Sequence, residues 1–202
     1  MTALSRKALA AATLLSAVSG FAQATTVTFS PLTGPNQGPA GDGVTYIEGG
    51  LTFMSSAVSW DALFHWGASE SFNADPGGAT LFQNWPGQGF TATRTDSGPF
   101  SLSSIDVADV YNVGTPASFM FVYLDLNGPH YSTKTLDSTV GLQTFTFNYP
   151  NIYYFAVFNI APNWVQIDNV VVGVPEPASY ALTIAGLLAV LGATRRRGDA
   201  AG

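Results

Sequence analysis

The chain has 202 residues, a length that fits one domain with processed ends. Only 10% of its residues are charged, and the absence of cysteine excludes disulfides, a thiol nucleophile and a cysteine-bound metal. Residues 25–174 contain 11 acidic residues against two basic ones, Arg94 and Lys134, which gives a net charge of −9. Such a domain repels a phosphate backbone, so we expect no nucleic-acid partner.

Residues 1–24 have the three parts of a secretory signal peptide. Arg6 and Lys7 form the positive start, residues 8–18 are apolar, and Ala22-Gln23-Ala24 has the small-x-small pattern that signal peptidase needs. We therefore expect export through the translocon and cleavage after Ala24. The apolar stretch is short for an uncleaved membrane anchor.

Residues 25–173 consist of short strand patterns separated by turn residues. The stretch 31–43 holds three prolines and four glycines, which predicts a loop, and the aromatic stretch 57–72 is interpreted as irregular. No helical periodicity interrupts the series, so the pattern predicts an all-β fold, an antiparallel β-sandwich or jelly roll. The predicted strands cover residues 25–29, 44–47, 50–54, 79–82, 90–95, 100–110, 117–126, 130–136, 143–147, 153–159 and 164–172.

Few residues offer catalytic chemistry. His65 and His130 are the two histidines, and the sequence has neither a Gly-x-Ser-x-Gly elbow nor a His-x-x-x-His pair. Asp106 and Asp109 are three residues apart, which on a strand places them on opposite faces, so they do not form a glycosidase pair. We expect Asp109 to be solvated.

Tryptophan can stack on sugar faces, and three tryptophans of the first half are candidate glycan contacts. These are Trp60, Trp66 and Trp85. Most aromatic side chains, however, pack in a core, and this alternative stays open for each of the three.

The last 29 residues, 174–202, form a separate segment with three parts. Val174-Pro175-Glu176-Pro177 interrupts regular structure, because proline lacks an N–H donor. Residues 178–194 carry no charge and predict a transmembrane helix of roughly 25 Å. Arg195, Arg196 and Arg197 follow, and such a basic cluster stays on the cytoplasmic side and stops transfer.

This order of parts resembles the PEP-CTERM sorting signal of Gram-negative bacteria. The resemblance implies recognition of Pro175, Glu176 and Pro177 by an exosortase, a membrane-embedded protease or transpeptidase. It also implies transient residence in the inner membrane, followed by release or attachment at the cell surface, commonly in strains that make exopolysaccharide.

The second half resembles the β-sandwich domains of PEP-CTERM proteins and the galactose-binding-like jelly rolls of carbohydrate-binding modules. The matching residues lie in 100–108, 145–147 and 165–170. In such modules an acid on the last strand meets a structural Ca²⁺, and the resemblance implies this role for Asp168, with Asp42 and Glu48 as guessed partners. Carboxylate, amide and carbonyl oxygens are suitable calcium ligands.

Three hypotheses follow. The first is a non-enzymatic, exported cell-surface or matrix protein, processed by exosortase and associated with exopolysaccharide, without a cofactor. The alternative is a carbohydrate-binding-module-like protein with a structural Ca²⁺. The third is a secreted hydrolase that depends on His65 or His130.

Overall fold

Alternation between apolar and polar residues governs the strands, as β8 (Phe100–Asp109) illustrates. Leu102, Ile105 and Val107 are fully buried, whereas Ser104 and Asp106 between them remain partly exposed. Because successive side chains of a strand point to opposite faces, this pattern gives β8 one face in the core and one face outside it.

The computed structural model describes residues 23–34, 39–57, 62–85, 87–160 and 162–174, together with Gly186. Residues 24–174 form one compact unit. Its elements are β1 (Gln23–Val27), the 3-10 helix η1 (Ser30–Leu32), β2 (Ala40–Gly43), β3 (Thr45–Glu48), β4 (Leu51–Ser55), β5 (Leu63–Trp66), β6 (Thr80–Gln83), β7 (Gly89–Arg94), β8, β9 (Ser118–Asp125), β10 (Gly128–Thr135), β11 (Gln143–Ile152), β12 (Tyr154–Asn159) and β13 (Val165–Val174).

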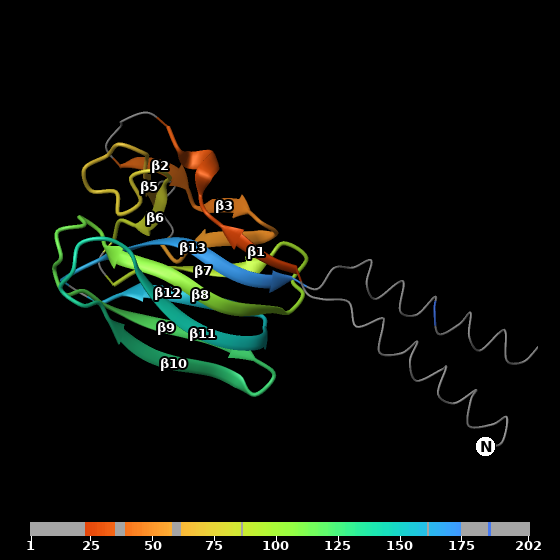
Figure 1. The fold of residues 1–202 in the computed structure, drawn as a ribbon. Coiled ribbons are helices and arrows are strands. Elements are labelled where there is room, and N and C mark those ends of the chain that lie inside the picture. The colour runs from red at the N-terminus through yellow and green to blue at the C-terminus, as the bar shows by residue number, and fades with distance from the viewer. Residues whose placement is uncertain are drawn as a thin grey trace, which may run out of the picture. The chain divides into compact units, whose positions relative to one another are not determined.

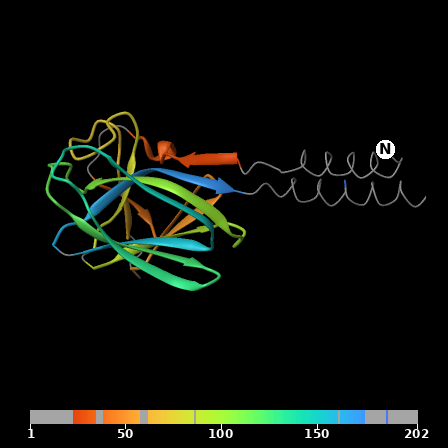
Figure 2. The same ribbon diagram turned by 60° about the horizontal axis from the view of Figure 1, so that its bottom comes forward.

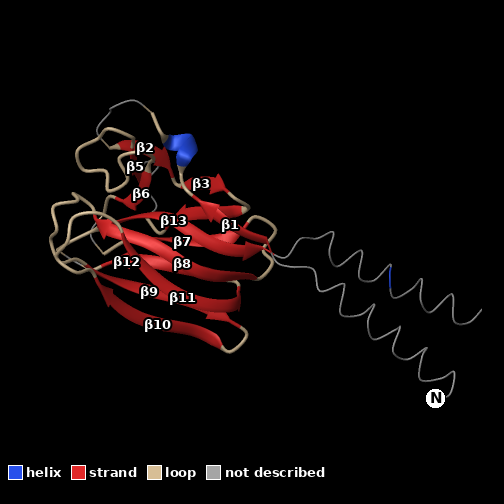
Figure 3. Cartoon of the chain, in the orientation of Figure 1, coloured by secondary structure: helices blue, strands red, loops and turns tan. Residues whose placement is uncertain are grey.

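The strands form two sheets that face each other (Figures 1 and 2). The seven-stranded sheet has the order β11-β8-β13-β6-β5-β2, with β1 also paired to β13, and the six-stranded sheet has the order β10-β9-β12-β7-β4-β3. The pairs with a given register are antiparallel. The predicted antiparallel β-sandwich is therefore confirmed, and Figure 3 shows how strands dominate it. The narrower galactose-binding-like class stays a prediction.

Two predictions about local structure are wrong. The predicted loop 31–43 ends in β2, and the predicted irregular stretch 57–72 contains β5. These two strands pair with each other, with a register shift between Gly41 and Gly43. Short strands that contain glycine or sit among turn residues show no clear alternation, so their hydrogen bonds to neighbouring strands, not their patterns, define them.

The core lies between the sheets and is rich in phenylalanine. Phe121 of β9 stacks on Phe147 of β11 with ring centroids 4.1 Å apart, which joins the six-stranded sheet to the seven-stranded one. Phe29 and Phe53 make an edge contact at 5.3 Å. Aromatic contacts of this geometry add to the hydrophobic stabilisation of the sandwich.

A second, smaller cluster lies on the outer face of the seven-stranded sheet. It consists of Trp66, Phe82 and Val110, with Phe64 and Trp164 packed against it. The loop of residues 67–79 lies over the same face, because it hydrogen-bonds Gln166, whose neighbours Val165 and Ile167 point into the main core. This covered face extends to the end of the sandwich at which many of the connecting loops lie (Figure 1).

The predicted terminal signals lie almost wholly outside the described residues. Only Gln23 and Ala24, in β1, the backbone of Val174, at the end of β13, and Gly186 belong to the described part of the chain. No helix among the described residues has the length and the hydropathy that a membrane span requires. The predicted transmembrane helix, 178–194, falls outside them except for Gly186.

Candidate functional site

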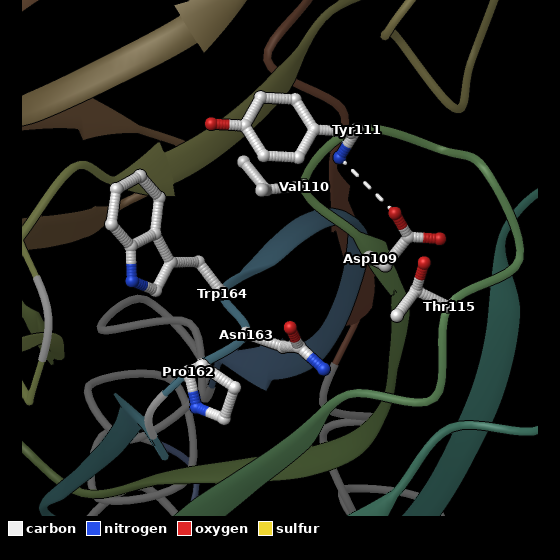
Figure 4. A pocket seen from close by; sticks show the side chains of 7 residues that line it. All are labelled: Asp109, Val110, Tyr111, Thr115, Pro162, Asn163 and Trp164. Carbon is white, nitrogen blue, oxygen red and sulfur yellow. Dashed lines mark hydrogen bonds between the residues drawn. The ribbon is translucent and has the colours of Figure 1, made fainter.

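A pocket of about 130 Å³ opens where the loop after β8 meets the loop before β13. A pocket of this size has room for several water molecules. Figure 4 shows Trp164 and Thr115 on opposite sides of this space, with Tyr111 above and Asn163 below. The lining residues are Asp109, Val110, Tyr111, Thr115, Pro162, Asn163 and Trp164.

Asp109, the last residue of β8, holds the first loop in shape. Its Oδ1 accepts hydrogen bonds from the backbone N–H groups of Tyr111 and Val113, both at 3.2 Å, and its Oδ2 accepts one from Gly114 at 3.0 Å. The residue is only 6% exposed. The expectation of a solvated Asp109 is therefore wrong, because three backbone donors take the place of water around its carboxylate.

Two aromatic side chains form walls of the pocket. Tyr111 is 47% exposed and makes an edge contact with Phe72 at 5.4 Å between ring centroids. Phe72 in turn packs on the buried Trp66 at 5.5 Å. Trp164 is half-buried against the second cluster. Both walls are thus supported from behind, while Tyr111 keeps ring surface open to a ligand.

Polar groups complete the lining. Asn163 donates from Nδ2 to the carbonyl of Pro116 at 2.7 Å, which fixes the amide and leaves Oδ1 as an acceptor. The Thr115 side chain is exposed and has no hydrogen bond within the described part of the chain. Fixed aromatic walls beside an acceptor and a hydroxyl can stack on the apolar face of a sugar ring and hydrogen-bond its hydroxyl groups.

Trp66 and Trp85, two of the three tryptophans that the sequence singled out, do not line this pocket. Trp66 is 4% exposed, and its indole N–H donates to the carbonyl of Val110 at 2.8 Å, so it packs within the domain and presents no open face to a ligand. Trp85 is 49% exposed and is not one of the lining residues. Trp60 lies outside the described residues.

Both histidines pair with carboxylates. His65 Nδ1 lies 2.8 Å from Asp42 Oδ2, and His130 Nε2 lies 3.1 Å from Asp125 Oδ1. His130 also stacks on Tyr123 with ring centroids 4.5 Å apart. Among the described residues, no serine or threonine hydroxyl hydrogen-bonds either imidazole. A nucleophile–histidine–carboxylate chain is therefore not assembled in the described part of the sandwich.

Asp168 is fully buried on β13, and its guessed calcium partners lie in other interactions. Asp42 pairs with His65, while Glu48 accepts hydrogen bonds from the Tyr46 hydroxyl at 2.7 Å and the Thr28 N–H at 3.2 Å. No group of three or more histidine and acidic residues within the described ranges is placed to hold a metal.

The surroundings of Asp168 do not fit calcium, which takes six to eight oxygen ligands. Asp106 lies opposite it on β8, but both Asp106 oxygens already accept hydrogen bonds, from Thr144 Oγ1 at 2.6 Å and from Asn169 Nδ2 at 2.9 Å. A site with Asp168 as a calcium ligand is therefore not supported by the residues around it.

The remaining predicted sites concern processing. Pro175, Glu176, Pro177 and the arginines 195–197 lie outside the described residues, as does Ala22. Ala24 is exposed on β1, and Val174 ends β13 directly before the Pro-Glu-Pro motif. These assignments stay predictions.

Sequence reasoning missed the pocket because its walls come from distant segments. Tyr111 directly follows a predicted strand, and Trp164 was counted as the start of another, so neither stood out as a ligand contact. The nearest sequence indication was the Pro162-Asn163-Trp164 stretch, where a loop residue pair precedes an aromatic side chain.

No family model and no curated protein matches the chain. Solved structures do match. A family 32 carbohydrate-binding module of AlyQ, in complex with 4,5-unsaturated mannuronic acid, has 16% identity over 63% of this chain and 96% of that chain, with a TM-score of 0.40. The family 32 module of C. perfringens NanJ, in complex with galactose, has 13% identity over 73% and 99%, with a TM-score of 0.39.

A third similar structure is the xylan-binding CBM22-1 domain of Paenibacillus barcinonensis Xyn10C. It has 14% identity over 77% of this chain and 95% of that chain, with a TM-score of 0.36. Similarities of this size identify neither a family nor a ligand for the present chain.

Proposed function

We propose that the sandwich is a non-catalytic carbohydrate-binding domain displayed at the cell surface. The observation that carries this proposal is the pocket, where the half-exposed Tyr111 ring and Trp164 stand beside the Thr115 hydroxyl and the Asn163 amide. The Asp109 carboxylate holds the loop after β8 in one conformation before any ligand binds. We therefore expect binding to cost little conformational entropy.

The charge of the domain limits which classes of glycan it can bind. With a net charge of −9 over residues 25–174, it repels polyuronates and other anionic polymers. The pocket is small, about 130 Å³, which favours one sugar unit over a longer stretch of chain. The proposed ligand is therefore a single neutral sugar unit, such as a chain end or a side branch of a surface polysaccharide.

The terminal segments extend this proposal to where the protein is located in relation to the cell. Residues 1–24 direct export, and the PEP-CTERM-like segment 174–202 holds the precursor in the inner membrane until exosortase acts near Pro175-Glu176-Pro177. A glycan-binding domain released or attached by this route would stay with exopolysaccharide outside the cell. Both resemblances support this step, which goes beyond the described residues.

Binding is tested with the purified chain on a panel of immobilised neutral and anionic polysaccharides, followed by calorimetry with the sugars of any polymer that retains it. We expect retention on a neutral glycan and at least a tenfold loss of affinity in Tyr111→Ala. Trp85→Ala is the matched control, because Trp85 has nearly the same exposure as Tyr111 but lies outside the pocket. Retention on no glycan, or equal losses in both variants, would remove the proposal.

Location is tested by mass spectrometry of the protein recovered from the medium and from the cell envelope. We expect a mature N-terminus at Thr25 and a C-terminus that ends near Pro177. Replacing Arg195, Arg196 and Arg197 by glutamine should cause the intact C-terminal segment to persist. An unchanged full-length chain in export-competent cells contradicts this part of the proposal.

A further inference from the structure

The hairpin between β9 and β10 carries Asn127, the one asparagine of the chain that glycine follows directly. Asn127 is exposed at the tip of the hairpin, and its neighbour Leu126 is 82% exposed. β10 is an edge strand of the six-stranded sheet, so it pairs with a strand on one side only (Figure 1). The tip of such a hairpin opens locally at little cost in free energy.

Gly128 leaves room for its backbone nitrogen to reach the side chain of Asn127. It has a φ of 114°, and no atom beyond its two chain neighbours lies within 4 Å of the position that a Cβ would take. The amide of Asn127 has one long hydrogen bond, from Nδ2 to Asp125 Oδ2 at 3.4 Å. A residue with a side chain would crowd the approach to the Asn127 amide carbon, whereas glycine does not.

Other asparagines of the described chain differ from Asn127. Asn73 and Asn159 are 2% and 5% exposed, and their amides donate to backbone carbonyls at 3.0 Å and 3.1 Å. Asn148 is exposed on β11, an edge strand of the seven-stranded sheet, but Tyr149 follows it. Asn148 is therefore an internal control, because it is open to water and has a bulky residue where Asn127 has glycine.

We propose that Asn127 is a site of spontaneous modification, at which the side-chain amide is lost as ammonia. Asparagine is one of the thermally labile residues. The Gly128 nitrogen gives its proton to hydroxide and attacks Cγ of Asn127, so a C–N bond forms and the bond from Cγ to Nδ2 breaks. Nδ2 takes a proton from water and leaves as ammonia, and a succinimide ring remains. Water then opens the ring at either carbonyl, which leaves an aspartyl or an isoaspartyl residue at position 127.

The modification changes the charge and the length of the turn. A carboxylate oxygen replaces the Nδ2 donor beside Asp125 Oδ2, so a weak attraction becomes repulsion between like charges. Asp125 also pairs with His130 at 3.1 Å, and the His130 ring stacks on Tyr123 with centroids 4.5 Å apart. The isoaspartyl form adds one backbone carbon between Asp125 and Gly128, which pair across the hairpin. The start of β10 is therefore loosened.

The hairpin lies at the opposite end of β9 from the sugar pocket. β9 begins at Ser118, three residues after Thr115 of the pocket lining, and runs for eight residues to Asp125. At roughly 3.3 Å per residue, this strand spans about 26 Å. Sugar binding should therefore be the same before and after modification. A failed binding assay leaves the modification untouched, and an unmodified Asn127 leaves binding untouched.

The test follows the purified full chain during storage at pH 6 and pH 9, with peptide mass spectrometry that reports conversion of amide to acid at each asparagine. We expect conversion at Asn127 to be at least tenfold faster than at Asn148. It should also be at least tenfold faster at pH 9 than at pH 6, because the attacking nitrogen must lose its proton. A methyltransferase specific for isoaspartyl groups should label the stored natural chain but not stored Asn127→Ser, which has no amide to lose.

Hydrogen–deuterium exchange measures the structural consequence. Exchange of the peptide that covers residues 124–131 should be at least threefold faster in the stored chain than in the fresh one, with no such change in stored Asn127→Ser. Equal conversion at Asn127 and Asn148 overturns the proposal, and so does an Asn127 that persists at pH 9, since the closed turn then protects it. A converted chain that exchanges like the fresh one contradicts the loosening of β10. If Asn127→Ser fails to fold, the comparison of Asn127 with Asn148 in the natural chain decides.

Discussion

The two outer faces of the sandwich differ in what covers them. On the seven-stranded sheet, loop 67–79 covers Gln166 and Thr80, which are 0% exposed and hydrogen-bond to it. The outer face of the six-stranded sheet has no such cover in the described chain, with Ile47 at 61%, Met54 at 50% and Tyr131 at 67% exposure.

The uncovered face is also free of charge. Its side chains follow from the strand registers and from which neighbours point into the core. They are Thr45, Ile47, Thr52, Met54, Thr91, Thr93, Ser118, Met120, Val122, Leu124, Pro129, Tyr131, Thr133, Thr135, Tyr154, Ala156 and Phe158. Water satisfies the hydroxyl groups of such a face, whereas buried polar groups depend on one another. Polar side chains should therefore respond very differently to substitution on the two faces.

The largest effect is expected for Gln166→Leu. The amide accepts from the Ala74 N–H and the Thr80 hydroxyl and donates to three carbonyls, so its loss leaves several buried groups unpaired. We expect a loss of about 3 kcal/mol in the free energy of unfolding, measured by chemical denaturation. Thr93→Ala, on the uncovered face, is the control and should change stability by no more than about 0.5 kcal/mol. Similar losses in both variants would erase the distinction between the faces.

The pH dependence of stability comes next. Burial raises the folded pKa of Asp168 to about 8, above its value of 3.8 in a model peptide, so between these values the native state holds a proton that the unfolded state has released. This contribution is complete below pH 3.8 and is lost as the pH rises towards 8. The difference in unfolding free energy between the natural chain and Asp168→Asn should shrink or reverse across this window. A difference in unfolding free energy that stays constant with pH contradicts a raised pKa for Asp168.

Asp96, in a turn, contributes with the opposite sign. The Gly98 N–H and the nearby Arg94 hold the pKa of this carboxyl below its usual range. Its contribution is present above the unfolded value and is lost as the pH falls, so it acts below the window in which Asp168 titrates. Asp168→Asn lacks the titration of Asp168 but keeps Asp96. Comparing the unfolding free energies of this variant and the natural chain at each pH therefore separates the two contributions.

An intermediate effect is expected for Asp109→Ala, at the end of β8. Three backbone N–H groups lose their acceptor, so we expect a loss of about 2 kcal/mol in the free energy of unfolding and weaker binding of any sugar that the pocket holds. Thr115→Ala, on the exposed rim of the same pocket, should weaken binding with little change in stability. Calorimetry and denaturation on both variants separate the two roles.

The smallest effect is expected for Ile47→Lys on the uncovered face. Its side chain is 61% exposed on β3, at the edge of the six-stranded sheet, where a lysine head remains in water. The free energy of unfolding should change by no more than about 0.5 kcal/mol. A large loss in the free energy of unfolding would mean that another part of the protein covers this face.

Sequence reasoning did well where a strand keeps one face in the core over many residues. Residues 100–110, 117–126 and 164–172 were predicted as strands and correspond to β8, β9 and β13. It failed at β2 and β5, which are four residues long and lack a regular pattern. For the candidate site it singled out Asp168, which the structure buries fully, but it did not identify Tyr111 or Trp164, because the walls of the pocket come from segments far apart in the sequence.

By itself, the sequence determined the all-β class, the acidic charge of the central domain and the expectation of two processed ends, because these depend on composition and on local order along the chain. Tertiary structure decided which strands share a sheet, that Trp66 is buried while Tyr111 is open, and that Asp168 is fully buried. The period-2 pattern of a strand shows which side chains share a face. Which loop covers that face depends on long-range strand pairing, and a local sequence pattern does not show it.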